Sequence, residues 1–193
     1  ATLDWALRLV VIVVLPATLA LVVLAGPLTV TIFHYGKFDE HDVRMSSLAL
    51  MAYASALLAF SMVKVLAPGY FARQDTRTPV AIGIKAMIAN MVLNLLFVVP
   101  LHLFWQVGHM GLSLATAAAA WLNAGLLLQG LVRRGICRPE AGFLRDVGRI
   151  GAAVALMCAV LVPALAWLQD LAALHWSARV LRLGLVCAAG LAV

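Results

Sequence analysis

Four polar side chains stand inside two long apolar stretches of this chain, where they could bind an anionic or strongly hydrated group. They are Lys64, Lys85, Asn90 and Asn94. The two asparagines are four residues apart, so on a helix they share one side. A polar stripe in an apolar environment needs either a neighbouring helix as its hydrogen-bond partner or a water-filled cavity. Both interpretations stay open, and each lysine could instead extend its ammonium group to the membrane surface.

A second group of polar residues lies in a short segment between those stretches, Ala67-Pro-Gly-Tyr-Phe-Ala-Arg-Gln-Asp-Thr-Arg-Thr-Pro-Val80. Arg73 and Arg77 place cations at head-group level, and Asp75 can accept hydrogen bonds from nearby backbone N–H groups. Thr78-Pro79 predicts a helix start, with Thr as the cap and Pro at the first position. The segment therefore predicts a turn that anchors the chain at the membrane surface, or a gate that touches a substrate.

The sequence contains no arrangement typical of an enzyme. No paired carboxylates occur inside an apolar stretch, and there is no GxSxG, P-loop, HExxH or GxGxxG motif. We therefore expect neither catalytic residues nor a metal or cofactor. The net charge of +6 is not accompanied by a compact basic and aromatic surface, so it does not indicate nucleic-acid binding.

Composition indicates the elements that must position these residues. The chain is 65% hydrophobic and 11% charged, which lies outside the range of soluble domains. About 20 apolar residues cross a bilayer as a helix. The expected fold is all-α, a polytopic transmembrane helix bundle of about six spans at 7–33, 45–66, 80–100, 110–132, 150–168 and 179–193. A soluble bundle is disfavoured because buried helices of this length are uncommon.

The positive charges predict an orientation. Cytoplasmic ends of membrane helices are enriched in Lys and Arg. If the segment around Asp75 is cytoplasmic, the inner ends carry Arg8, Lys64, Arg73, Arg77, Lys85, Arg133, Arg134, Arg138, Arg145 and Arg149, and the outer ends carry only Lys37, Arg44, Arg179 and Arg182. The amino end of the chain is then cytoplasmic, and its basic inner surface should attract anionic membrane lipids.

Three segments are expected along the chain. Residues 1–132 would form four transmembrane helices, 133–149 a basic cytoplasmic or interfacial linker, and 150–193 two peripheral transmembrane helices. The chain lacks an initiator Met and its last residues lie inside an apolar run, so we expect it to be part of a longer protein.

Particular residues resemble a known family. The segment Leu66–Val80, then Asn90-Met-Val-Leu-Asn94-Leu, Gly36-Lys-Phe38 and Gly111-Leu-Ser-Leu-Ala-Thr116 resemble the MurJ (MviN) lipid II flippases. These belong to the multidrug, oligosaccharidyl-lipid and polysaccharide exporter superfamily. The resemblance extends over nearly the whole chain, and it is most specific in the polar segment.

The resemblance implies a carboxy-terminal lobe of an exporter-type fold plus two extra helices that form a groove for a lipid tail. Its partner would be the remaining amino-terminal half of the same transporter, which would carry the arginines for the lipid diphosphate. The implied activity is alternating-access transport of lipid II, the undecaprenyl-diphosphate-linked peptidoglycan precursor, from the cytoplasmic to the periplasmic leaflet. That places the protein in the bacterial cytoplasmic (inner) membrane, in cell-wall biogenesis and the maintenance of cell shape.

Under this hypothesis the cavity candidates are Lys64, Lys85, Asn90 and Asn94, and the cytoplasmic gate candidates are Arg73, Asp75 and Arg77. Alanine at Lys85 or Asn94 should lower lipid II export without lowering protein abundance. Two alternatives stay open: a drug/cation antiporter or exporter of another polyprenyl-linked glycan, and a non-transport scaffold for cell-wall enzymes. The lack of acidic residues within the spans counts against a cation antiporter.

Overall fold

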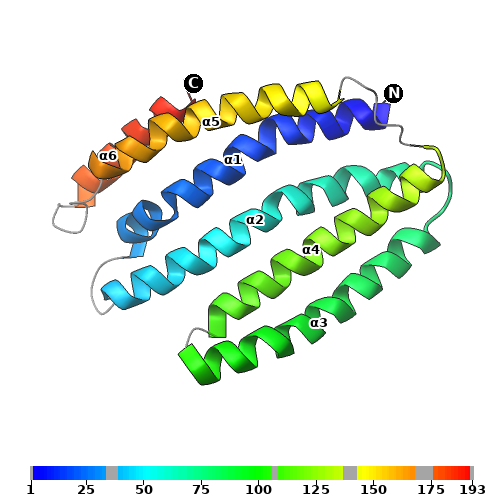
Figure 1. The fold of residues 1–193 in the computed structure, drawn as a ribbon, viewed down its shortest axis with the longest axis horizontal. Coiled ribbons are helices and arrows are strands. Elements are labelled where there is room, and N and C mark those ends of the chain that lie inside the picture. Colours follow the sequence, from blue (N-terminus) through cyan, green and yellow to red (C-terminus); the bar gives the residue numbers. More distant parts are fainter. Residues whose placement is uncertain (1, 34–38, 106–107, 137–142, 168–175, 192–193) are drawn as a thin grey trace.

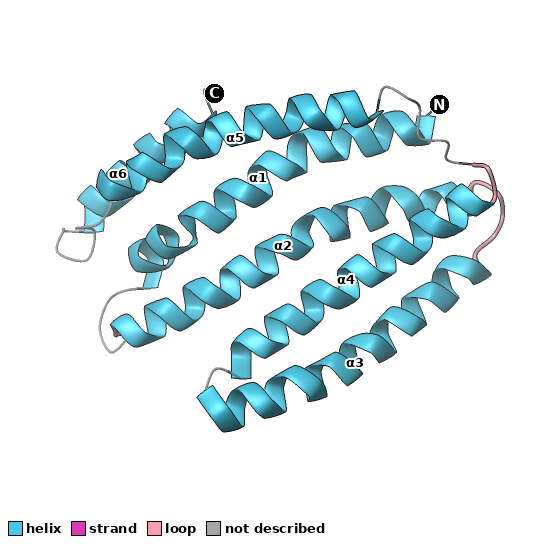
Figure 2. Ribbon diagram, in the orientation of Figure 1, coloured by secondary structure: helices cyan, strands magenta, loops and turns pink. Residues whose placement is uncertain are grey.

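The computed structural model describes residues 2–33, 39–105, 108–136, 143–167 and 176–191, and these residues form helices and short turns. The helices are α1 (Thr2–Phe33), α2 (Glu40–Phe71), α3 (Arg77–Trp105), α4 (Gly108–Arg133), α5 (Phe143–Trp167) and α6 (Trp176–Leu191). Each predicted span falls on one of them, and the all-α class is confirmed (Figure 2).

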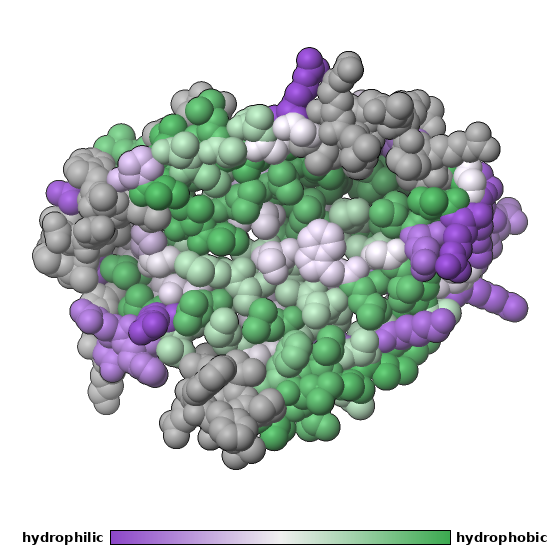
Figure 3. Space-filling model, viewed as in Figure 1, coloured by the Kyte–Doolittle hydropathy of each residue, from purple (hydrophilic) through white to green (hydrophobic). Residues whose placement is uncertain are grey.

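Four described helices are long and apolar enough to cross a bilayer: Leu3–Phe33, Glu40–Phe71, Arg77–Val99 and Met110–Arg133. In α5 the described apolar stretch is the shorter segment Gly148–Ala164. Hydrophobic surface covers most of the face in Figure 3, and hydrophilic residues gather mainly toward the two ends. This pattern fits a helical bundle that crosses a membrane several times, and crossings by α5 and α6 stay a prediction.

The helices lie side by side in a curved layer, in the order α3, α4, α2, α1, with α5 and α6 against α1 at the far edge (Figure 1). Small residues let α2 and α4 approach closely: Ala56 and Ala59 are 0% exposed, against Ala117, Ala120 and Ala124 of α4. A layer leaves two broad faces, and which face each polar residue occupies decides what it can bind.

The ends of α2 and α3 differ from the sequence prediction. Helix α2 continues through Pro68 and Gly69 to Phe71, so the turn is confined to 72–76, and α3 begins at Arg77. Pro79 is therefore the third residue of its helix, where its missing N–H costs nothing because the first backbone donors of a helix have no internal partner. Tyr70 explains the extension of α2, because its ring is buried (1% exposed) in the core with Leu66, Leu127 and Leu131.

At the other end of α2, Asp39 and Asp42 form a capping box. The N–H of Asp42 donates to Asp39 Oδ1 at 2.9 Å, and the N–H of Asp39 donates to Asp42 Oδ2 at 3.4 Å. Helix α5 begins at Phe143, inside the predicted linker 133–149, and runs without a break into the fifth apolar stretch. The division of the chain into three segments stays a prediction.

Candidate functional site

The structure gathers the predicted inner cations at one end of the layer. The start of α1, the turn between α2 and α3, the end of α4 and the start of α5 all lie at the right-hand end of Figure 1. The cations there are Arg8, Lys64, Arg73, Arg77, Lys85, Arg133, Arg134, Arg145 and Arg149. Arg44, Arg179 and Arg182 lie within the first two turns of α2 and α6, at the opposite end. Lys37 and Arg138 lie outside the described residues. The predicted inner and outer cations that the structure describes thus lie at opposite ends of the layer. Which of the two ends is cytoplasmic stays a prediction.

Asp75 is held by both neighbouring helices. Its Oδ1 accepts the N–H of Thr78 at 3.0 Å, and its Oδ2 accepts the Thr78 hydroxyl at 2.7 Å, so Asp75 rather than Thr78 caps the start of α3. Arg134, just beyond α4, donates to Asp75 Oδ2 at 2.5 Å and to Thr78 Oγ1 at 3.1 Å. The hydrogen bonds from Thr78 and Arg134 lower the pKa of Asp75 to about 2. The carboxylate is thus ionised at any physiological pH, and this contact is not a pH switch.

Tyr70 continues this network into the core. Its hydroxyl donates to the Leu127 carbonyl of α4 at 2.8 Å, and the Arg134 guanidinium carbon lies 5.4 Å from the centre of its ring. Gly130 leaves the room for that hydroxyl, since a Cβ there would lie 2.2 Å from the Tyr70 oxygen. Together Tyr70, Asp75, Thr78 and Arg134, which we call the hairpin clasp, fasten the α2–α3 turn to the end of α4.

Arg73 and Arg77 are not part of the clasp. Arg73 on the turn and Arg77 at the start of α3 are both exposed, and neither side chain has an ion pair or hydrogen bond to another described residue. The clasp therefore fixes the backbone that carries these two cations and leaves their guanidinium groups accessible. Of the three gate candidates, Asp75 is bound by Thr78 and Arg134 within the described helices, and Arg73 and Arg77 have exposed side chains.

One face of the layer collects polar groups halfway along the helices. Asn90 of α3 donates to Thr116 of α4 at 3.5 Å, and Asn94 donates to Asn90 Oδ1 at 2.8 Å. Asn123 lies seven residues after Thr116, on the same side of α4. We call this the asparagine face, made by Tyr53, Lys64, Asn90, Asn94, Thr116 and Asn123.

The opposite face is defined by a contact between α2 and α4. The indole N–H of Trp121 donates to the Ser55 carbonyl at 3.2 Å. Residues two positions apart on a helix point in directions about 200° apart. Ser55 therefore lies opposite Tyr53 on α2, and Trp121 lies opposite Asn123 on α4. Lys85 shares a shallow groove with Leu122, beside Trp121. The tryptophan face is thus made by Ser55, Lys85, Trp121 and Leu122.

The cavity candidates are therefore divided. Asn90 and Asn94 share the asparagine face with Lys64, which lies 11 residues after Tyr53 and so on the same side of α2. Lys85 precedes Asn90 by five residues, about 140° around α3, and lies on the tryptophan face. Both lysines are exposed, and no single cavity within this layer holds both.

The two faces differ in how their polar groups are satisfied. On the tryptophan face the Trp121 N–H has its acceptor, and the Ser55 hydroxyl donates to the Ala52 carbonyl at 2.7 Å. On the asparagine face Asn94 Oδ1 and Asn123 Oδ1 are buried without a partner among the described residues. An unpaired polar group in hydrocarbon costs several kcal/mol. These two oxygens are buried within the layer itself and mark the asparagine face as the more polar one, whereas Trp121 and Ser55 of the tryptophan face are paired within the protein.

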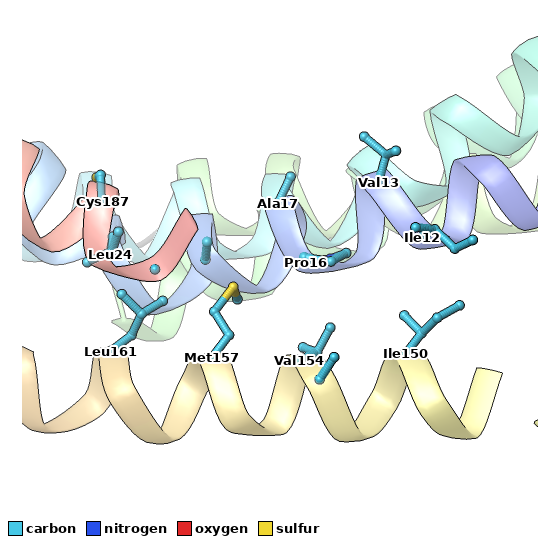
Figure 4. A pocket seen from close by; sticks show the side chains of 13 residues that line it. Ile12, Val13, Pro16, Ala17, Leu24, Ile150, Val154, Met157, Leu161 and Cys187 are labelled. Carbon is cyan, nitrogen blue, oxygen red and sulfur yellow. The ribbon is translucent and has the colours of Figure 1, made fainter. Parts of the chain in front are cut away.

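A separate apolar groove lies where α5 and α6 meet α1, shown in Figure 4. Its volume is about 510 Å³. Pro16 and Leu24 of α1 face Val154, Met157 and Leu161 of α5 across it, and α6 adds Cys187 and Gly190. The lining side chains are apolar or thiol, so the groove suits a hydrocarbon chain.

Sequence reasoning missed several of these residues. Arg134 was counted only as an inner cation, although Asp75 is the sole acid between Asp42 and Glu140 and must find its ion partner among the nearby cations. Tyr70 and Gly130 are 60 positions apart and carry no local signal of their contact. The spacing of five residues between Lys85 and Asn90 does indicate that the two side chains lie on different sides of α3.

Long apolar helices side by side in one layer, with most of the cations at one end, are typical of a multi-pass α-helical membrane protein. The family described as "Lipid II flippase MurJ" matches residues 1–185. This chain belongs to the MurJ lipid II flippase family.

Individual relatives agree with the family match. The Burkholderia cenocepacia protein named "Lipid II flippase MurJ" is 45% identical over 157 residues, which cover 81% of this chain and 29% of that protein. A "Probable lipid II flippase MurJ" of Vibrio cholerae is 43% identical over 169 residues, which cover 88% of this chain and 30% of that protein. A protein of the same name from Haemophilus influenzae is 38% identical over 203 residues, which cover 95% of this chain and 38% of that protein. The chain spans about a third of the length of these curated relatives.

Proposed function

We propose that this chain is the carboxy-terminal part of a lipid II flippase of the bacterial inner membrane. The observation that carries this proposal beyond family membership is the asparagine face, where the half-buried amide side chains of Asn90, Asn94 and Asn123 gather in the middle of an apolar layer. A glycan carries many hydroxyl and amide donors, and a water-filled path would supply others. A diphosphate-linked sugar cannot cross hydrocarbon without such a path, because burying its charges costs many kcal/mol.

The other features fit into the same transport step. Lys64, near the clasp end of the asparagine face, would attract the diphosphate as the head group enters, and Asn90 and Asn94 would line the middle of its path. Arg73 and Arg77, whose backbone is fixed by the hairpin clasp and whose side chains are exposed, would be cations of the cytoplasmic gate. The groove between α1, α5 and α6 would hold the prenyl tail while the head group crosses. Rocking of this lobe against the rest of the transporter would open the path to each leaflet in turn.

Asn94→Ala in the full-length transporter tests this function. Cells depleted of their own flippase would express the variant, and lipid II accessible at the outer leaflet would be measured. We expect export to fall roughly tenfold at unchanged protein abundance, since a side-chain hydrogen bond to the crossing head group is lost.

The matched control is Ser55→Ala, which also exchanges a polar side chain for alanine but lies on the tryptophan face, and it should keep export near that of the parent protein. If the parent full-length protein exports no lipid II in the depleted cells, the proposed function is wrong. If Asn94→Ala exports as well as the parent, Asn94 does not line the path.

A further inference from the structure

We propose that the tryptophan face holds a binding site for an anionic membrane phospholipid, with its phosphate at Lys85 and an acyl chain along α3. This inference concerns a structural lipid and does not depend on which cargo the transporter carries.

The shape of the site is amphipathic. A groove of about 430 Å³ lies between α3 and α4, lined by Lys85, Ile88, Ala89, Val92, Leu93 and Leu122. Lys85 is the only polar side chain in this lining, and the other α3 residues follow it over the next two turns. A cation at one end of an apolar strip matches the order of phosphate and acyl chain in a phospholipid.

The position of Lys85 along the helix fits the inner leaflet. It lies eight residues after Arg77, the first residue of α3, which corresponds to about 12 Å at 1.5 Å per residue. Its ammonium group can therefore reach the head-group region while its methylenes lie against the groove. The apolar strip beyond Lys85 runs toward the middle of the bilayer, as an acyl chain does.

Lys85 also has no acidic partner among the described residues. The sequence contains no Asp or Glu from 76 to 139, so α3 and α4 offer no carboxylate to it. Asp75, the nearest acid in the sequence, is already bound by Arg134 and Thr78. An ammonium group this far along a membrane helix is stabilised by an anion, and in a lipid-facing groove the available anion is a lipid phosphate.

The face itself is suited to lipid. The polar groups beside the groove are satisfied within the protein, since Trp121 donates to Ser55 and Ser55 donates to Ala52. A second helix packed there would leave Lys85 without a charge partner unless it brought an acid. A phospholipid supplies both the negative charge and the hydrocarbon, so we assign the groove to it rather than to another segment.

The test measures binding of phosphatidylglycerol and of neutral phosphatidylcholine to the purified full-length protein in detergent, by native mass spectrometry. Lys85→Gln should weaken phosphatidylglycerol binding by about fivefold, the contribution of one basic residue to anionic-lipid attraction. Lys85→Arg should keep it. Val92→Trp, which fills the groove, should lower the binding of both lipids at this site.

Arg149→Gln is the matched control, because it removes an exposed cation at the same end of the layer but on α5, away from α3 and α4. It should leave phosphatidylglycerol binding unchanged. The proposal is overturned if Lys85→Gln binds phosphatidylglycerol as the parent does, or if Arg149→Gln loses as much. It is also overturned if added lipid II displaces phosphatidylglycerol in the parent but not in Lys85→Gln, because the site then belongs to the cargo.

Discussion

Gly111→Ala is expected to lower the melting temperature of the full-length protein in detergent by roughly 5 °C. A Cβ at Gly111 would lie 2.9 Å from the carbonyl carbon and 3.0 Å from the carbonyl oxygen of Phe97, and 3.1 Å from the Val98 nitrogen. All three atoms belong to the backbone of α3, so no side-chain rotation relieves the contact. The whole helix must shift away from α4, and its packing on that neighbour is lost.

The matched control for this change is Gly83→Ala, because Gly83 is also in a membrane helix of the same pair and a Cβ there meets nothing within 4 Å. Alanine is the better helix former, so Gly83→Ala should melt at the parent temperature or slightly above it. Equal melting temperatures for the two variants would show that α3 and α4 are not packed as closely as described.

Gly130→Ala is expected to destabilise the protein by about 3 kcal/mol, and adding Tyr70→Phe is expected to reverse most of that loss. The added Cβ would lie 2.2 Å from the Tyr70 oxygen, which cannot move aside because it is bonded to the Leu127 carbonyl in a buried site. Removing the hydroxyl leaves Cζ as the nearest ring atom, at 3.4 Å, an ordinary contact.

A double-mutant cycle measures this coupling. Tyr70→Phe alone should cost about 1 kcal/mol, the value of one hydrogen bond. The double variant should be close to Tyr70→Phe and more stable than Gly130→Ala, a strongly non-additive result. Gly125→Ala on the same helix, where a Cβ meets nothing within 4 Å, should not depend on Tyr70. Additive losses at Tyr70 and Gly130 would contradict the hairpin clasp.

The helices themselves could be predicted from the sequence, because a membrane span needs a long apolar run and this chain has such runs between short polar segments. The exact ends could not. Pro68 and Gly69 are typical of a turn, yet they are helical because Tyr70, one residue further, is buried between α2 and α4. The burial of Tyr70 thus outweighs the low helix propensity of the two residues that precede it.

The site was only partly predictable, for a similar reason. Helical spacing placed Asn90 and Asn94 together, and the structure adds the hydrogen bond from Asn90 to Thr116. The ion pair between Asp75 and Arg134 joins residues 59 positions apart, and such pairs follow from the tertiary fold rather than from local sequence. The gate and cavity roles of Arg73, Arg77 and Lys64 stay predictions, since they depend on segments that lie outside this chain.

The central claim is that the asparagine face borders water in the membrane and the tryptophan face contacts lipid. Phe60, on the side of α2 that carries Tyr53, and Leu122 are matched, since their exposed fractions are 37% and 39%. Each would be changed to cysteine in a full-length protein whose Cys137, Cys158 and Cys187 are replaced by alanine, and a small water-soluble thiol reagent would be applied to both sides of the membrane. We predict modification of Phe60→Cys and none of Leu122→Cys. Modification of Leu122→Cys, or none of Phe60→Cys, would contradict the account.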